Sequence, residues 1–246
     1  MNEKKVLFLT GGSKGIGKNI AIEFAKSGYQ IAFTFLSDEA GAKNTANEIM
    51  TYGVLVQYYK LNVADYKEVL LVRDQVLKRF SKIDVLVNNA GIIEPSLIKD
   101  TSLDSWQRVI NVNLTGAFNC MKSVIPVMEK QNYGRIITIG SIAGDKGSRG
   151  AASYSASKAG IVGLTKTAAR ELAEKCITVN VVSLGYMAQG ITARLPERLQ
   201  KNLIREIPQG KWGDVEKAAK MLVHLASEEA EYITGQSISI SGGSYM

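Results

Sequence analysis

Tyr154 and Lys158 stand four residues apart in the stretch 152–174, whose apolar periodicity predicts a helix. Residues at this spacing share one helix face, so the two side chains are expected to be neighbours. A tyrosine with a pKa of about 10 is a poor acid at neutral pH unless a nearby cation favours its ionised form, and the lysine supplies that cation. Chance alone gives roughly one such pair in a chain of this composition, so the spacing gains meaning only from its surroundings.

Two more polar residues are expected at the same place because they follow successive strands. Ser141 comes directly after the apolar run 135–139 and Gly140, and Asn113 lies in the helix that follows the segment 88–91. A serine hydroxyl can hold a carbonyl oxygen beside the phenol, and an asparagine can fix a water that replenishes the proton. Taken singly, Ser141 could cap the next loop and Asn113 could satisfy backbone groups. Together with the Tyr–Lys pair, they predict a site that delivers a proton.

A glycine-rich turn over residues 10–17 follows the apolar run 6–9 and leads directly into an amphipathic helix. Glycines let the backbone turn tightly and let a pyrophosphate approach the N–H groups at the helix start, where the helix dipole favours anions. Such a turn on its own also occurs for purely structural reasons. Beside a proton-delivery site it indicates a bound dinucleotide, and hence hydride transfer.

Apolar runs rich in β-branched residues alternate with segments of helical periodicity along the 246 residues. This alternation predicts right-handed crossovers and a parallel sheet covered on both faces. Because no Pro- or Ser-rich linker interrupts it, residues 1–246 are expected to form a single α/β domain, a doubly wound Rossmann fold with a seven-stranded parallel sheet and helices on both faces. Residues 185–212 lack a strand and are the expected substrate-covering lid. The predicted strands are 6–9, 31–35, 54–59, 83–87, 135–139, 177–182 and 237–240.

Composition and charge exclude several classes of protein. No stretch approaches the ~18 apolar residues that cross a bilayer, and no secretory signal is recognisable, so a cytoplasmic protein without membrane association is expected. The formal charge of +7 suits an anionic cofactor or an acidic partner, but Lys and Arg are scattered, which argues against nucleic acid. Cys120 and Cys176 lack metal-ligand spacing and indicate free thiols in a reducing compartment. With His224 as the one histidine, no metal site is expected.

These motifs together resemble the short-chain dehydrogenase/reductase family, and the match runs the length of the chain. Within that family, several segments are similar to the 3-oxoacyl-[acyl-carrier-protein] reductases of type II fatty acid synthesis. The resemblance implies a homotetramer that reduces a 3-oxoacyl thioester to the 3-hydroxyacyl form with NADPH. The matching family motifs are Thr10-Gly11-x-x-x-Gly15-x-Gly17, Asn88-Asn89-Ala90-Gly91, Asn113, Ser141 and Tyr154-x-x-x-Lys158.

The resemblance also implies a role for each catalytic residue. Tyr154 is expected to protonate the carbonyl oxygen, while Lys158 lowers the pKa of the tyrosine and holds the nicotinamide ribose. Ser141 is expected to orient the ketone, and Asn113 to anchor the water of a proton relay. The implied cofactor-binding residues are Gly11, Ser13, Lys14, Gly15, Ile16, Gly17, Leu36, Asn62, Val63, Asn89, Ala90, Gly91, Tyr154, Lys158, Met187 and Gln189.

Cofactor preference is expected to depend on the end of the second strand. Enzymes that prefer NAD commonly place a carboxylate there, which repels a 2′-phosphate. Here Leu36 is uncharged, although Asp38 follows closely. Ser13 and Lys14 offer a hydroxyl and a cation to a phosphate. The sequence therefore predicts NADP(H).

After the sixth strand the chain departs from the family pattern of Pro-Gly followed by a threonine that binds the nicotinamide carboxamide. Leu184 replaces the proline, and Gln189 stands where the threonine is expected. Either the Gln189 side chain or the backbone N–H of Met187 is expected to bind the carboxamide instead.

The expected substrate carrier is the acyl carrier protein or CoA. Lys175 matches a basic position that these reductases use for the carrier protein, whereas Asn132, with Lys130 nearby, takes the place of the other. One alternative is a ketoreductase or alcohol dehydrogenase acting on another carbonyl substrate, such as a polyketide, acetoacetyl-CoA or a sugar. The other is a catalytically silent nucleotide-binding homologue, which only the departure at 184–189 supports.

Overall fold

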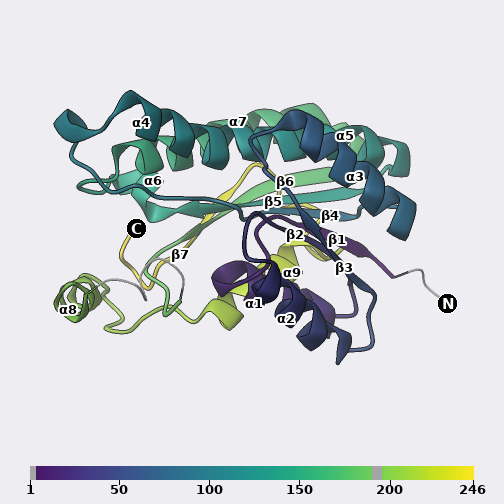
Figure 1. Cartoon of the computed structure of the whole chain (residues 1–246), viewed down its shortest axis with the longest axis horizontal. Helices are drawn as coiled ribbons and strands as arrows, with labels where there is room; N and C mark the ends of the chain where they lie inside the picture. The colour runs from purple at the N-terminus through teal and green to yellow at the C-terminus, as the bar shows by residue number, and fades with distance from the viewer. Residues whose placement is uncertain (1–3, 190–195) are drawn as a thin grey trace.

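The computed structural model describes residues 4–189 and 196–246. Seven parallel strands form one sheet in the order β3-β2-β1-β4-β5-β6-β7, which confirms the predicted doubly wound α/β fold (Figure 1). The order reverses between β1 and β4, the place where such sheets bind ligands. The strands are β1 (Val6–Leu9), β2 (Gln30–Phe35), β3 (Val56–Lys60), β4 (Val85–Asn88), β5 (Gly134–Ser141), β6 (Ile177–Leu184) and β7 (Ser237–Ile240).

Helices cover both faces of the sheet, with α1, α2 and α9 on one face and α3, α5 and α7 on the other (Figure 1). Because successive strand residues point to opposite faces, Leu7 packs in the first core and Phe8 in the second, and both are fully buried. The helices are α1 (Gly15–Lys26), α2 (Glu39–Met50), α3 (Tyr66–Phe80), α4 (Leu103–Ile110), α5 (Gly116–Gln131), α6 (Ile142–Lys146), α7 (Ala152–Leu172), α8 (Glu197–Arg205) and α9 (Val215–Leu225), with short helices η1 (Ile98–Asp100), η2 (Asn111–Thr115) and η3 (Ala173–Lys175).

The strands lie where the sequence predicts them, with ends that differ by one or two residues. Strands β5 and β6 run two residues further than predicted because they pair along their whole length, as far as Ser141 beside Leu184. Strand β4 begins two residues later than predicted. The backbone N–H and carbonyl of Ile83 bond to the Gln131 side chain instead, at 3.2 and 2.9 Å.

The carboxyl ends of the strands lie at one edge of the sheet, on the left in Figure 1, and helices α6 and α8 lie at the same edge. Within residues 185–212, the structure contains helix α8 and a parallel bridge from Met187 to Gly213. Residues 190–195 of the expected lid lie outside the described residues. None of the helices in the described ranges has the length and apolar character that a membrane crossing requires.

Candidate active site

The glycine turn lies between β1 and α1 and is shaped by close backbone contacts. Gly11 and Gly15 have φ of 72° and 56°, a region that favours glycine. A Cβ on Gly17 would overlap the carbonyl oxygen of Gly11, and one on Gly12 would lie 2.6 Å from the Phe33 ring. The N-cap residue Lys14 makes no side-chain bond to the start of α1. The turn therefore presents uncapped N–H groups at a helix start, which is the arrangement that binds a phosphate anion.

Two side chains hold this turn against the loop after β4. Asn89 Nδ2 donates to the carbonyl oxygens of Thr10 and Gly11, both at 2.9 Å. The Thr10 hydroxyl accepts from the backbone N–H groups of Asn89 and Ala90, both at 3.0 Å. Asn89, which the sequence places along the cofactor, thus uses its side chain to fix the shape of the glycine turn.

Ser141 and Tyr154 meet at the carboxyl end of β5. The strand ends in Ser141, whose hydroxyl caps α6 by accepting from Ala143 N at 3.2 Å. Tyr154 lies in the first turn of α7, and its phenol shares a hydrogen bond with the Ser141 side chain. The two hydroxyls therefore lie side by side, as required to hold and protonate one carbonyl oxygen.

Lys158 lies one turn further along α7 and is buried, with its Nζ 5.6 Å from the centre of the Tyr154 ring. Its ammonium donates to the carbonyl oxygen of Ile139 at 2.6 Å. Burial lowers the pKa of Lys158 to about 8 because desolvation disfavours the charged form. The Tyr–Lys neighbourhood expected from the spacing is present, and its cation is buried away from solvent.

The net shift of the tyrosine pKa differs from the one expected from the sequence. Burial raises the pKa of Tyr154, and the hydrogen bond with Ser141 offsets that effect only in part. A phenol with a raised pKa is fully protonated at neutral pH, so it holds the proton that a carbonyl oxygen would receive. The spacing could not show this direction, because it gives the neighbouring charge and not the extent of desolvation.

Asn113 is buried in the π-helical segment η2 between α4 and α5. Its Oδ1 accepts from Ile92 N at 2.8 Å, and its Nδ2 donates to Ile92 O at 2.9 Å and to Ser157 Oγ at 3.0 Å. Ser157 Oγ donates in turn to the Tyr154 carbonyl oxygen at 2.7 Å. The side chain therefore joins the loop after β4 to the start of α7, which is the structural role that the sequence left open.

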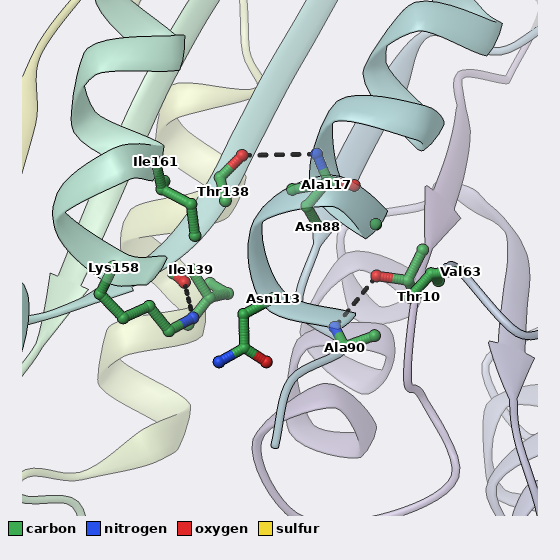
Figure 2. A pocket seen from close by; sticks show the side chains of 11 residues that line it. Thr10, Val63, Asn88, Ala90, Asn113, Ala117, Thr138, Ile139, Lys158 and Ile161 are labelled. Atoms are coloured by element: carbon green, nitrogen blue, oxygen red, sulfur yellow. Dashed lines mark hydrogen bonds between the residues drawn. The ribbon is translucent and has the colours of Figure 1, made fainter. Parts of the chain in front are cut away.

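A small polar interior lies behind these residues, and Figure 2 shows Lys158 and Asn113 pointing toward the same space from α7 and η2. Asn88 Nδ2 donates to Thr138 Oγ1 at 3.4 Å on its far side. Thr138, Ser157 and Ile92 were not predicted from the sequence as site residues. Of these, only Thr138 could have been found from the sequence, because it is a polar residue within an apolar strand.

Lys14 and Asp38, one basic and one acidic residue near the place expected for a 2′-phosphate, form an ion pair. Lys14 Nζ lies 3.1 Å from Asp38 Oδ2, and Asp38 Oδ1 also accepts from Gly41 N and so caps α2. These contacts lower the pKa of Asp38. Leu36, the residue directly after β2, is 58% exposed and leaves the strand end without a charge of its own.

The remaining predicted cofactor contacts lie at the same sheet edge with mixed roles. Val63 is buried, whereas Asn62 uses its Oδ1 to accept from Ala64 N at 3.1 Å. Met187 is buried. Gln189 is exposed, and its Oε1 accepts from Asn19 Nδ2 on α1 at 2.8 Å. In this structure Gln189 contacts α1 rather than the catalytic residues, and no sequence motif predicts Asn19 as its partner.

A parallel doubly wound sheet, a glycine turn at a helix start and a Ser–Tyr–Lys set at the end of β5 define a class of nucleotide-dependent oxidoreductase. The chain belongs to the short-chain dehydrogenase/reductase family, whose members use a nicotinamide cofactor. Residues 11–245 match the family model described as enoyl-(acyl carrier protein) reductase.

Relatives named 3-oxoacyl-[acyl-carrier-protein] reductase FabG match the chain from end to end. The protein of that name from Staphylococcus aureus strain N315 is 40% identical over 246 residues, which is all of both chains. The one from Thermotoga maritima is 40% identical over 241 residues, 98% of each chain. The one from Salmonella typhimurium is 38% identical over 244 residues, 99% of this chain and 98% of the relative.

Proposed function

We propose that this protein reduces a 3-oxoacyl thioester to the 3-hydroxyacyl form with NADPH, as a step of type II fatty acid synthesis. The observation that carries the proposal is the hydrogen-bonded Ser141–Tyr154 pair beside the buried ammonium of Lys158, at the sheet edge that also holds the glycine turn. The names of the full-length relatives point to the same substrate class.

The residues around the glycine turn fit a dinucleotide, because Gly11 and Gly15 take up positive φ and the absence of side chains at Gly12 and Gly17 lets the turn pack tightly against Phe33 and its own backbone, so that the N–H groups at the start of α1 stay exposed to a ligand. Gly11, Gly15 and the start of α1 would hold the pyrophosphate through backbone N–H groups. When bound, the cofactor supplies the hydride that the ketone carbon accepts.

Tyr154 is the proton donor in this proposal. Its phenol gives a proton to the carbonyl oxygen, and the Ser141 hydroxyl orients that oxygen by a hydrogen bond. The phenolate that remains is stabilised by the Lys158 ammonium, because an opposite charge within a few ångströms favours the ionised form. The hydrogen bonds of Asn113 fix the start of α7 and so the position of both groups.

The preference for NADP(H) is supported by Lys14. Its side chain is 61% exposed, so it can turn from Asp38 to a 2′-phosphate with little cost. When Lys14 turns away, Asp38 still accepts from Gly41 N at the start of α2, where the positive end of the helix dipole partly offsets the carboxylate charge that would repel the phosphate.

The proposal extends to partners and location. An acyl carrier protein or CoA carries the thioester, a homotetramer in the cytoplasm is the working form, and residues 185–212 cover the substrate. Another carbonyl substrate of the same chemistry is the nearest alternative. The description of the matching family model adds reduction of an enoyl thioester as a second candidate.

The decisive experiment follows oxidation of NADPH with acetoacetyl-CoA, an acetoacetyl carrier protein and crotonyl-CoA. We expect turnover of both acetoacetyl substrates, and NADH in place of NADPH should be slower. Tyr154→Phe should lower kcat by about 10²–10⁴-fold, the contribution of a general acid, with NADPH binding retained. Turnover of crotonyl-CoA alone would favour the enoyl reductase, and NADPH binding without turnover of any carbonyl substrate would favour a silent homologue.

A further inference from the structure

The loop after β4 joins the π-helical segment η2 to the start of α7. Residues 91–97 form this loop, here called the strap. At one end its backbone is bound by the side chain of Asn113 in η2, at 2.8 and 2.9 Å. At the other end the N–H of Ser96 donates to the carbonyl oxygen of Gly150 at 2.9 Å, and Ser96 forms a parallel bridge with Ala151. The strap therefore contacts the two residues that directly precede α7.

The start of α7 depends on this contact because it has no side-chain cap of its own. Its N-cap residue is Ala151, which makes no side-chain hydrogen bond to the first turn, and Gly150 before it has a φ of 74°. The first turn carries Tyr154, so a shift of the helix start moves the phenol relative to Ser141 on β5. A misplacement of about 1 Å can lower the rate of a reaction by about 10²-fold.

The middle of the strap is held by an ion pair between Glu94 and Arg108 of α4. Arg108 Nε donates to Glu94 Oε1 at 3.0 Å, and its Nη2 donates to Oε2 at 2.8 Å. Within the described part of the chain, Glu94 makes the hydrogen bonds that hold residues 93–95. Pro95 follows Glu94, and a residue before proline is restricted to extended backbone. Helix α4, which lies at the same edge of the molecule as α6 (Figure 1), thus holds a stiff part of the strap.

The geometry of this pair distinguishes it from an ordinary surface ion pair. Most exposed pairs contribute little, but bidentate pairs of arginine and carboxylate are the exception, because two parallel bonds fix both side chains. The Glu94 side chain is only 32% exposed. Hydrogen bonds with Arg108 and Ser105 lower the pKa of Glu94 to about 2, so the carboxylate stays ionised near neutral pH. The pair therefore has the geometry and the charge to hold the strap in place.

We propose that Glu94 is a positioning residue for the reaction. Paired with Arg108, it holds the strap, and the strap fixes where α7 begins and therefore where the Tyr154 phenol lies relative to Ser141. Glu94 does not contact the reacting groups and acts through the backbone of the strap. This inference rests on the proposed function. It predicts that kcat depends on Glu94 while KM for NADPH does not, because separate side chains hold the glycine turn.

The first test measures reduction of an acetoacetyl thioester by NADPH in Glu94→Ala and Arg108→Ala. We expect kcat to fall about ten- to a hundredfold in each variant, since the phenol is misplaced, and KM for NADPH to stay within about twofold. The control is Glu228→Ala, which removes the carboxylate that pairs with Lys5 at 2.9 Å before β1 begins, at the opposite edge of the sheet. Its kcat should stay within about twofold of the unaltered value, because the two sites are far apart.

Reversal of the pair separates positioning from the loss of one charge. Glu94→Arg alone brings two cations together, and Arg108→Glu alone brings two carboxylates together, so each should lose at least as much kcat as the alanine variants. The double variant Glu94→Arg/Arg108→Glu restores opposite charges and should recover kcat to within about threefold of the unaltered protein. A double variant no faster than the single reversals overturns the inference. An unchanged kcat in Glu94→Ala, or an equal loss in Glu228→Ala, also overturns it.

Amide hydrogen exchange tests the positioning without any substrate. The N–H of Ser155 donates to the carbonyl oxygen of Ala151 at 2.8 Å, which is the first helical hydrogen bond of α7. In Glu94→Ala this amide should exchange several times faster, whereas unchanged exchange in the middle of α7 shows that the variant is folded. Equal exchange of the Ser155 amide with and without Glu94 overturns the inference. No turnover of any thioester by the unaltered protein would refute the proposed function, and the exchange comparison would still decide whether Glu94 positions α7.

Discussion

The glycine turn after β1 and the segment after β6 lie at the same edge of the sheet, but they are held by different kinds of contact. Around the turn, Asn89 and Thr10 fix backbone atoms at 2.9–3.0 Å, and Gly17 has no room for a side chain. After β6, Met187 is buried, but Gln189 is exposed and held by one side-chain bond to Asn19. The first region has a fixed shape that suits an invariant ligand, and the second has contacts that a ligand can exchange.

The largest effect is expected in the glycine turn, whose shape is fixed by close contacts. In Gly17→Ala, the new Cβ overlaps the Gly11 carbonyl oxygen, so the turn must open and NADPH binding should be lost. Overpacking of this kind costs about 1–3 kcal/mol of unfolding free energy, measured by urea denaturation alongside cofactor titration. Gly163→Ala is the control, because a Cβ there meets nothing within 4 Å in the middle of α7. It should bind cofactor normally and be as stable or slightly more stable, and equal behaviour of the two variants would contradict the fixed-shape account.

The next effect tests Lys158, which is buried on α7, where its charge is electrostatically unfavourable. Its folded pKa of about 8 is below the unfolded value of 10.5, so burial of the charge destabilises the fold fully below pH 8. As pH rises from 8 to 10.5 the unfolded chain loses this proton as well, and the penalty disappears. In Lys158→Met, the stability difference relative to the unaltered protein should therefore shift against the variant by about 2–3 kcal/mol between pH 7 and pH 10.

The same variant should lose activity by about two orders of magnitude or more, because no cation remains to stabilise the Tyr154 phenolate. Lys166→Met, at an exposed position of the same helix, controls for the loss of a lysine from α7. A pH-independent stability difference in Lys158→Met would mean that the ammonium is not desolvated as its surroundings indicate.

The sequence predicted the fold and the gathering of Ser141, Tyr154 and Lys158 because both depend on local patterns. Continuous apolar runs locate the parallel strands, and Ser141 follows a strand directly. Side-chain partners that lie far apart in the chain could not be predicted in this way. Asn113 bonds to Ile92 and Ser157, and Gln189 bonds to Asn19, 170 residues away.

The extent of desolvation could not be predicted from the sequence either, because it depends on packing around the side chain rather than on spacing. The upward shift of the Tyr154 pKa and the bond from Lys158 to the Ile139 carbonyl both arise from that packing. By contrast, the position of Lys175 could have been foreseen. A residue that precedes a strand in a parallel sheet lies at the edge opposite to the ligand site.

The smallest effect is expected in the segment after β6, and it tests whether Gln189 has a role in turnover. The bond between Asn19 and Gln189 is exposed, so it should contribute only about 0.5–1.5 kcal/mol. Gln189→Thr and Asn19→Ala should each change KM for NADPH by no more than a few-fold and leave kcat nearly unchanged. The double variant should resemble either single one, because both remove the same bond. A different outcome is that Gln189→Thr changes kcat while Asn19→Ala does not. Gln189 would then leave Asn19 during turnover and contact the reacting groups. In that case the segment after β6 would belong to the catalytic machinery as fully as the glycine turn does.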